Sequence, residues 1–203
     1  MLKILEGWGI RRVWTIQPVE VMEEINRKGF YVCNPDKAMY ISDPEVSFKD
    51  SYDWLVKEMY KRVGPAPSGV IYPVWAWYSR DWKHKKPDLR NAGYDTPGTR
   101  CVCIELEIPD NEVLLSDYDL WHYVFNKWWI DDSTCEEEWD RNQDWFDSLS
   151  VDYREKLKVD SWSKIFDLTP VNTKWMCKGR YIQATFWVLR KENIVDVRYF
   201  VCK

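Results

Sequence analysis

The closing stretch of the chain, Tyr181–Lys203, reads YIQATFWVLRKENIVDVRYFVCK, and the fold assignment depends on it more than on any other stretch. Two runs rich in aromatic and β-branched residues flank residues 190–193, which predicts two strands joined by a turn. Residues two apart on a strand share a face, so Gln183, Thr185 and Trp187 are expected to point to one side. The other side is typical of core, and we expect the side with Gln183 to form the floor of a binding site.

Upstream of this stretch, strand and helix patterns alternate as in an α+β fold. The first strand, RRVWTIQP, ends at Pro18, and a helix is expected from about Val19 to Lys28, with Gly29 just past its end. The clearest strand is CVCIELEIPD, in which apolar residues alternate with cysteines and glutamates. A further strand is expected in VIYPVWAWYSR, and helices after Ser47 and in SDYDLWHYVFNKWW and VDYREKLKVDSWSKIFDL.

Length and charge limit the classes of protein that fit. The 203 residues suit a single domain over 1–203, with the acidic, Trp-containing stretch at about 131–148 as a candidate insertion. The net charge of -4 argues against a general nucleic-acid binder and against a membrane-surface protein, because both need a broad excess of Lys and Arg. No apolar run is long enough for a spanning helix and the N-terminus does not match a secretory signal, so we expect a cytoplasmic protein.

Cysteine, histidine and tryptophan usage narrows the chemistry. The six cysteines are scattered and only two histidines are present, so we expect reduced core thiols and no metal site. No motif pairs a nucleophile with a base, which disfavours an ordinary hydrolase, and His122 is expected to be a helix histidine against the core. The fourteen tryptophans exceed what a core of this size needs, so some are expected to line a pocket or an interface.

Two stretches could recognise a nucleotide directly. The loop stretch HKKPDLR concentrates His84, Lys85, Lys86 and Arg90, a pattern that a phosphate-bearing ligand would favour, although charge clusters on loops are more often simply solvated. The strand stretch VWAWY is expected to place Trp75 and Trp77 on one face and Tyr78 on the other. Its indoles could stack a purine or nicotinamide ring, and core packing is the alternative.

Two further pairs carry weaker signals. Glu105 and Glu107 share a strand face, which could support acid/base catalysis or stabilise a sugar cation, although such a pair more often forms the wet face of a strand. Gln183 and Thr185 could equally be polar residues that bond to neighbouring strands. The sequence pattern leaves both alternatives open.

Nearly the whole chain resembles a bacterial and phage family catalogued as a domain of unknown function, number 3841. The stretches that carry this likeness are VWTIQPVEV, YDWLVKEMYKRVGPAPSG, YPVWAWY, KHKKPDLR, VCIELEIPDNEVLLSDYDLWHYVFN and QATFW. The order of elements, from a first strand ending in a polar turn to a final hairpin beginning QATFW, more remotely resembles the ADP-ribosyltransferase fold. These resemblances imply a mixed or antiparallel sheet with helices packed around it, a C-terminal β-hairpin and the cytoplasm of a bacterial host cell.

The remoter resemblance also implies a departure from catalysis. In that superfamily a late strand carries a Gln-Ala-Glu-Phe-like run whose Glu holds the nicotinamide ribose of NAD. Gln183, Ala184 and Phe186 match the run, and Thr185 stands in the place of the Glu. A threonine hydroxyl cannot supply the negative charge that stabilises an oxocarbenium ion. On the first strand, Arg12 and Thr15 fall near the residues that such enzymes place against NAD.

The function that follows is a nucleotide binder. We expect an NAD- or ADP-ribose-type nucleotide to be held without turnover, as in a phage sponge that sequesters a nucleotide immune signal, with no required cofactor. The expected binding residues are Arg12, Trp14, Thr15, Gln17, Trp75, Trp77, Tyr78, His84, Lys85, Lys86, Arg90, Gln183, Thr185 and Trp187.

Two alternatives stay open. One is an active ADP-ribosyltransferase or NAD-processing enzyme that uses Glu105 or Glu107 as a substitute carboxylate. The other is a protein-interaction module, or a homo-oligomer, formed through the surplus tryptophans. The residues expected on that surface are Trp128, Trp129, Trp139 and Trp145.

Overall fold

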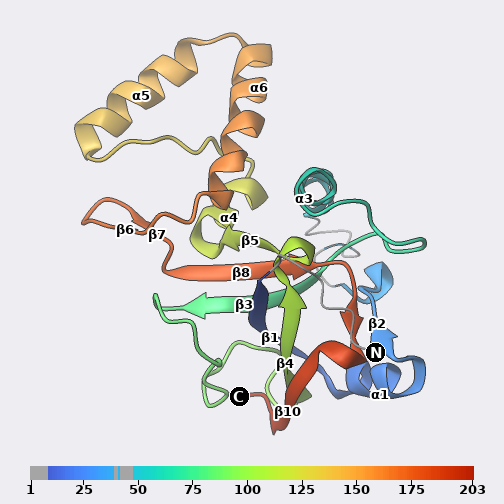
Figure 1. The fold of residues 1–203 in the computed structure, drawn as a ribbon. Coiled ribbons are helices and arrows are strands. Elements are labelled where there is room, and N and C mark those ends of the chain that lie inside the picture. The colour runs from blue at the N-terminus through green and yellow to red at the C-terminus, as the bar shows by residue number, and fades with distance from the viewer. Residues whose placement is uncertain (1–8, 39–40, 42–47) are drawn as a thin grey trace. The chain divides into compact units, whose positions relative to one another are not determined.

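A computed structural model describes residues 9–38, 41 and 48–203 of the chain (Figure 1). The expected helix start at Ser47 lies outside the described residues. The chain divides into two compact units. The first unit comprises Met1–Tyr78, His84–Leu114 and Gln183–Lys203, and the second unit comprises Ser79–Lys83 and Leu115–Ile182.

The described residues form an α+β structure, as expected, around a six-stranded antiparallel sheet. Its strands stand in the order β10-β4-β1-β3-β8-β5. Their bounds are β1 Ile10–Pro18, β3 Val74–Arg80, β4 Arg100–Pro109, β5 Leu114–Asp117, β8 Tyr181–Phe186 and β10 Ile194–Val201. Two small ladders pair β2 (Phe30–Tyr31) with β9 (Leu189–Arg190), and β6 (Val171–Asn172) with β7 (Cys177–Lys178).

Helices connect these strands. The α-helices are α1 Val19–Lys28, α3 Lys49–Arg62, α4 Tyr118–Phe125, α5 Glu136–Ser148 and α6 Val151–Ser161. Short 3-10 turns are η1 Pro35–Lys37, η2 Asp110–Glu112, η3 Trp162–Phe166 and η4 Lys191–Asn193. The bounds predicted for α1 are confirmed at both ends. Gly29 closes this helix at φ 84°, a conformation that strains any residue with a Cβ.

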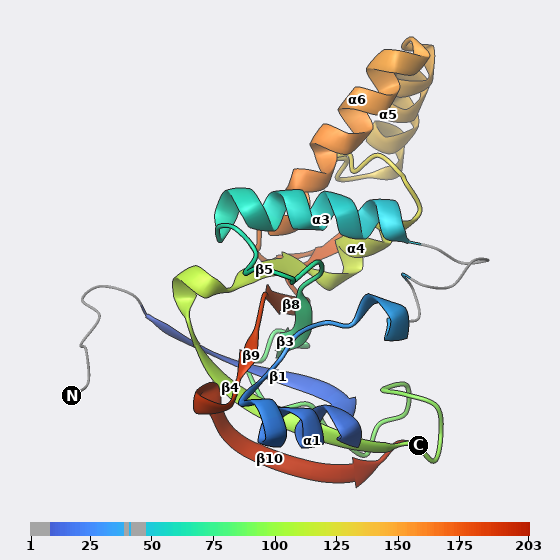
Figure 2. The same ribbon diagram turned by 90° about the vertical axis from the view of Figure 1, so that its right-hand side faces the viewer.

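The core of the first unit lies between β4 and α1 (Figure 2). Strand β4 forms as predicted, with Val102, Ile104, Leu106 and Ile108 almost completely buried. Burial does not alternate along it, because residues 101, 103 and 105 on the other face are buried as well. On α1 the buried residues are Val21, Met22 and Ile25. They recur three and four positions apart, so they form one apolar face of the helix. The opposite face of α1 therefore stays available to border a pocket.

The other face of β4 carries the two glutamates. Along β1 and β4, Arg12 lies opposite Glu107 and Trp14 lies opposite Glu105. On the other side of β4, Asp196 of β10 lies opposite Glu105. Cross-strand neighbours on one face interact through their side chains, so the register pairs Arg12 with a carboxylate of opposite charge. It also places two carboxylates, Glu105 and Asp196, opposite each other, and Lys86 lies close to both.

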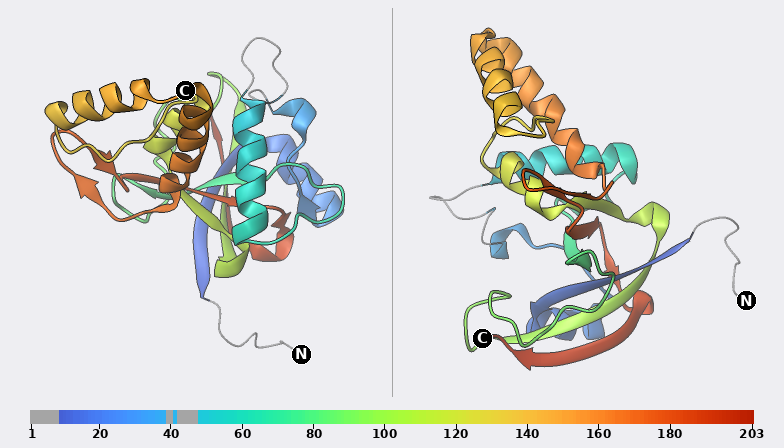
Figure 3. Two further views of the ribbon diagram at one scale, coloured as in Figure 1. Left: turned by 90° about the horizontal axis from the view of Figure 1, so that it is seen from above. Right: turned by 90° about the vertical axis from the view of Figure 1, so that its left-hand side faces the viewer.

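The second unit packs around α4 and the turn that follows α6. Trp121, Val124 and Ile165 are almost completely buried, and Asp117 caps the N-terminus of α4 by accepting a hydrogen bond from the backbone N–H of Leu120 at 2.9 Å. Helices α5 and α6 follow as a hairpin (Figure 3). Helix α5 covers most of the acidic stretch that the sequence marked as a candidate insertion, and none of its residues is buried.

Candidate functional site

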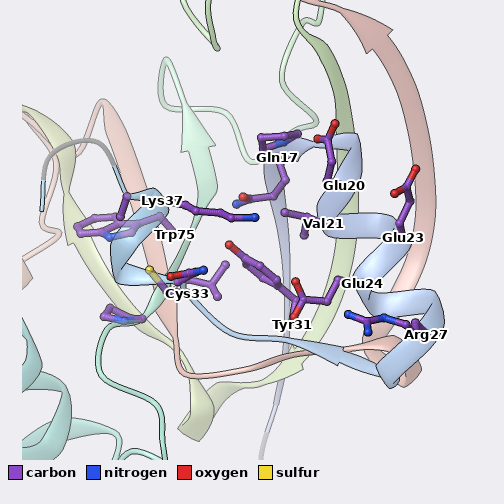
Figure 4. Close-up of a pocket in the computed structure, with 15 residues that line it drawn as sticks. Gln17, Glu20, Val21, Glu23, Glu24, Arg27, Tyr31, Cys33, Lys37 and Trp75 are labelled. Atoms are coloured by element: carbon purple, nitrogen blue, oxygen red, sulfur yellow. The ribbon is translucent and has the colours of Figure 1, made fainter. Parts of the chain in front are cut away.

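The first unit contains a pocket of about 580 Å³ beside α1 (Figure 4). Its walls come from the end of β1, the polar face of α1, the segment 31–38 and the start of β3. The lining residues are Gln17, Pro18, Glu20, Val21, Glu23, Glu24, Arg27, Tyr31, Cys33, Asn34, Lys37, Ala38, Pro73, Val74 and Trp75. A volume of this size falls within the range of small-molecule sites. We call it the α1 pocket.

Hydrogen bonds fix the β1 wall of the α1 pocket. The Gln17 side-chain amide donates to the Thr15 hydroxyl at 2.7 Å, and that hydroxyl donates to the backbone carbonyl of Trp75 at 2.8 Å. Thr15 is buried, so this chain of bonds couples β1 to β3 beneath the pocket. The ends of the Gln17, Tyr31 and Lys37 side chains point toward one another across the opening (Figure 4). Polar groups that converge in this way can orient a ligand.

Charges of both signs border the α1 pocket. The polar face of α1 contributes Glu20, Glu23, Glu24 and Arg27, and η1 contributes Lys37. The Glu24 carboxylate accepts from Lys28 at 2.6 Å, one turn further along α1. The lining therefore holds three carboxylates and two cations, an arrangement suited to a ligand that itself carries both signs of charge.

The hydroxyl and the thiol of the α1 pocket both stay protonated near neutral pH. Burial, together with the nearby Cys33 and Glu24, raises the pKa of Tyr31 to about 12. Burial also raises the pKa of the Cys33 thiol. A thiol is a nucleophile only as the thiolate, so Cys33 is poorly suited to attack a ligand. Tyr31 can act as a hydrogen-bond donor, and neither group is available as a base.

Several of the expected binding residues form a different group, on the Glu105 face of the sheet. The Trp14 indole donates to Glu105 at 2.9 Å, and Lys86 lies 3.2 Å from the same carboxylate and 2.6 Å from Asp196. Arg12 lies 2.5 Å from Glu107 and 3.5 Å from Glu105. We call this group the Glu105 cluster; its members are Arg12, Trp14, Lys86, Glu105, Glu107 and Asp196.

Glu105 is held in its ionised form by these partners. Burial alone would raise its pKa, but hydrogen bonds from Trp14 and Lys86 and the charges of Lys86 and Arg12 outweigh burial and lower the pKa. A carboxyl group with a lowered pKa is a poor general acid near neutral pH. The contacts give Glu105 a structural role, joining β1, β4, β10 and the loop that carries Lys86.

Replacing Glu105 by glutamine is expected to lower the free energy of unfolding by about 1–3 kcal/mol, because Lys86 and Arg12 lose a buried counter-ion. The lowered pKa makes this contribution fully present above the unfolded value near 4.5 and lost as the pH falls through the folded value. Urea unfolding at pH 7 and pH 3 should therefore show a gap between wild type and variant that narrows in acid.

Glu107→Gln is the matched control for this prediction. The Glu107 side chain is 43% exposed, so its loss is expected to cost less than about 1 kcal/mol. Equal destabilisation by the two substitutions would contradict the role given to Glu105. The same variant bears on the enzyme alternative, which expects Glu107→Gln to abolish turnover while the fold stays intact.

The basic loop folds back against the strands of the first unit. His84 stacks on Tyr78 with ring centroids 4.5 Å apart, contacts the Trp14 ring at 5.1 Å, and has its Nε2 atom 2.8 Å from the Arg12 carbonyl oxygen. Arg90 pairs with Asp88 of the same loop, and Lys85 is exposed. The side chains of Lys86 and Arg90 thus form ion pairs with carboxylates of the protein itself.

Four other expected residues lie outside the α1 pocket: Trp77 of β3, Gln183 and Thr185 of β8, and Trp187, which follows β8. Thr185 is fully buried and its hydroxyl donates to the Leu114 carbonyl at 3.4 Å, while the buried Trp187 indole donates to the Gly64 carbonyl at 3.1 Å. Gln183 is half-buried, and none of the three lines the α1 pocket. Trp77 of β3 lies opposite Trp14.

Of the expected residues, only Gln17 and Trp75 line the α1 pocket, and Thr15 supports them. Sequence reasoning missed Tyr31, the last residue of β2, and Cys33, Asn34 and Lys37, which follow that strand. The one available signal was the polar face of α1, since a helix that is apolar on one side only presents its other side to solvent or ligand.

A family model described as "Domain of unknown function (DUF3841)" matches residues 12–195 of the chain. No curated protein and no solved structure matches it. Within the described ranges, no group of three or more His, Cys, Asp or Glu side chains could hold a metal ion. No helix among those same residues combines the length and apolar character needed to cross a membrane.

Proposed function

The chain belongs to the family described as "Domain of unknown function (DUF3841)", and we propose that it binds a nucleotide of the NAD or ADP-ribose type and releases it unchanged. The observation that carries this proposal is the composition of the α1 pocket. The pocket has a volume of about 580 Å³. It is bordered by the rings of Tyr31 and Trp75, the side-chain amides of Gln17 and Asn34, and charges of both signs. Flat rings bind flat bases, and amides hydrogen-bond to their edges.

The mixed charge of the α1 pocket favours NAD⁺ within that class. Oxidised NAD carries a cationic pyridinium ring and an anionic diphosphate. The carboxylates on α1 suit the pyridinium ring and the ribose hydroxyls, while Arg27 and Lys37 suit the diphosphate. The ring of NADH is neutral, so we expect NAD⁺ to bind more tightly than NADH.

Three features support binding without turnover. Tyr31 and Cys33 stay protonated because their pKa values are raised. Glu105 is ionised, lies in the Glu105 cluster and does not line the α1 pocket. Thr185, which stands where the resemblance to ADP-ribosyltransferases would place the catalytic glutamate, has a hydroxyl in place of a carboxylate and lies outside the lining of the α1 pocket, so that position supplies no carboxylate there. A protein with these properties suits the sequestration of a nucleotide immune signal, as in a phage-encoded sponge.

Protection of Cys33 tests the location of this site. Cys33 lines the α1 pocket and is half-buried, so a ligand in the pocket should block its alkylation. With NAD⁺ at about ten times its Kd, labelling of Cys33 by N-ethylmaleimide at pH 8.5 is expected to slow about tenfold, as measured by peptide mass spectrometry.

Cys135 provides the internal control for the protection experiment. It is also half-buried but belongs to the second unit, so its labelling rate should not change with NAD⁺. Unchanged labelling of Cys33 in the presence of bound NAD⁺ would move the site away from the α1 pocket. Equal slowing at both cysteines would indicate a general effect of the ligand on the protein.

A further inference from the structure

The second unit contains a separate pocket of about 640 Å³. Aromatic rings and cations line it together, from the end of α4, from α5 and from α6. Among them are the rings of Trp128, Trp129 and Trp139 and the cations Lys127, Arg154 and Lys158. We call it the tryptophan pocket. It accounts for three of the four tryptophans that the sequence assigned to an interaction surface.

Contacts within the second unit hold the walls of the tryptophan pocket in place. The Trp162 indole donates to the Trp128 carbonyl at 2.8 Å, and the Ile130 N–H donates to the Ser161 hydroxyl at 3.0 Å. The Trp129 ring stacks on Phe146 of α5 with centroids 4.7 Å apart and an interplanar angle of 3°. The segment 127–130 is thus tied to both helices of the hairpin.

Lys127 occupies a backbone position that favours glycine. Helix α4 ends in a Schellman motif: the N–H of Trp128 donates to the Tyr123 carbonyl at 2.8 Å, and the N–H of Lys127 donates to the Val124 carbonyl at 3.2 Å. The Trp128 and Tyr123 rings make the apolar contact that usually accompanies this motif. Lys127 adopts φ 57°, the left-handed conformation in which any Cβ is strained.

A strained residue persists where its surroundings require it, and such positions cluster at ligand sites. The side chain at this position lines the tryptophan pocket. The local backbone would therefore be more stable with glycine, but the pocket would lose a cation. The strained backbone at Lys127 thus points to a ligand site independently of which side chains line the pocket.

The exposed rings and the charges define the ligand chemistry. Trp128 and Trp139 are 57% and 43% exposed, so both offer indole surface to a ligand. Three cations and one carboxylate, Glu155, line the pocket, and Glu155 pairs with Lys158. Arg154 lies 3.5 Å from Asp147, an exposed carboxylate outside the lining. The first turn of α5 is acidic, with Glu136, Glu137 and Glu138, and acidic residues near the site disfavour a long polyanion. These charges therefore favour a small anion over a long polyanion as the ligand.

We infer that the tryptophan pocket binds a small ligand that combines a planar aromatic ring with one anionic group. The ring lies against Trp128 and Trp139, and the anion lies against Lys127 and Arg154. Aromatic rings stack on indole, and lysine and arginine form charge-assisted hydrogen bonds with an anion. This site belongs to the second unit, so it does not depend on the α1 pocket or on nucleotide binding there.

Two fluorescent probes test the inference on the full chain. 8-Anilinonaphthalene-1-sulfonate has an aromatic body and one anionic group, and N-phenyl-1-naphthylamine has the same body without the charge. We expect the sulfonate to bind saturably and at least about tenfold more tightly than the amine, because a hydrogen bond to a charged group contributes that much. Equal affinity for the two probes would overturn the role of the cations.

Paired variants locate the binding site. Arg154→Gln is expected to weaken sulfonate binding about tenfold, whereas Lys156→Gln, on the same helix but outside the pocket lining, should leave the affinity unchanged. Trp139→Ala should weaken binding, and Trp175→Ala, an exposed indole elsewhere in the second unit, should not. Equal effects within either pair would place the probe outside the tryptophan pocket.

Lys127→Gly separates binding from stability. Relief of the backbone strain is expected to raise Tm by about 2–4 °C, while loss of the cation weakens sulfonate binding at least fivefold, or about 1 kcal/mol. Both changes together support the inference. A stabilised variant with unchanged sulfonate affinity would show that Lys127 is not part of the binding site and would overturn the assignment of the anion.

Discussion

Replacing Tyr31 by alanine is expected to weaken NAD⁺ binding by about 5- to 150-fold, which corresponds to the 1–3 kcal/mol measured for stacking of one base on an aromatic ring. Tyr31 lines the α1 pocket with a half-buried ring, and its hydroxyl points toward the ends of Gln17 and Lys37 (Figure 4). Isothermal titration calorimetry on the wild type and the variant measures the change directly.

Two control variants sharpen the Tyr31 prediction. Tyr31→Phe keeps the ring and removes the donor, so its loss of affinity should be smaller than that of Tyr31→Ala. Tyr60→Ala removes a tyrosine that is 63% exposed on α3 and lies outside the pocket lining, so its affinity should equal that of the wild type. A Tyr31→Ala protein that folds and binds NAD⁺ with unchanged affinity would contradict the assignment of the pocket.

Replacing Asp117 by alanine is expected to lower the free energy of unfolding by about 2–5 kcal/mol. Asp117 is completely buried. One carboxylate oxygen caps α4 through the N–H of Leu120, and the other accepts from the N–H of Gly179. Alanine would leave both buried N–H groups without an acceptor, and each such group costs about 1–3 kcal/mol. Thermal and urea unfolding should both report the loss.

Two further substitutions control for the loss of charge at Asp117. Asp117→Asn keeps one side-chain oxygen as an acceptor, so its destabilisation should be smaller than that of the alanine variant. Asp140→Ala removes an exposed carboxylate from α5 and should change stability by less than about 0.5 kcal/mol. An Asp117→Ala protein as stable as Asp140→Ala would show that the two hydrogen bonds contribute little.

Local signals predicted the elements of this fold well. Helix α1 has its bounds at the expected residues because Pro18, Gly29 and the charges between them act within a few positions of one another. Strand β4 forms where the alternation of its sequence predicts a strand, although residues 101–106 are all buried and only its presence, not its exposed face, could be predicted. Both signals depend on short stretches of chain, so they predict the elements without knowledge of the tertiary structure.

The candidate site was harder to predict because it depends on contacts between distant stretches. Lys86 meets Asp196 across 110 positions of sequence, so the basic loop serves the Glu105 cluster rather than standing as an isolated charge run. Thr185 was expected on an open face, but β8 lies between β3 and β5 and both sides of it are buried at residues 184–186. Alternation along a strand does not reveal whether its second face is covered.

The lining of the α1 pocket was hard to predict for the same reason, because it depends on contacts between distant stretches of the chain. Gln17 and Trp75 were expected to bind ligand and do line the pocket, whereas Tyr31 and Lys37 carried no motif of their own. They reach the pocket because the chain returns along α1 after Gly29. The pairing of β2 with β9, which joins residues about 160 positions apart, positions the start of that return segment.

Recovery of a bound nucleotide from the purified protein tests nucleotide binding without turnover. The purified protein is incubated with NAD⁺, NADH, ADP-ribose, cyclic ADP-ribose variants and common mononucleotides, washed, denatured by heat, and the released molecules are identified by mass spectrometry. We expect near-stoichiometric recovery of one intact nucleotide, with NAD⁺ preferred over NADH and less nucleotide retained by Tyr31→Ala. Recovery of free nicotinamide or of an ADP-ribosylated product would contradict binding without turnover, and recovery of no nucleotide would contradict nucleotide binding itself.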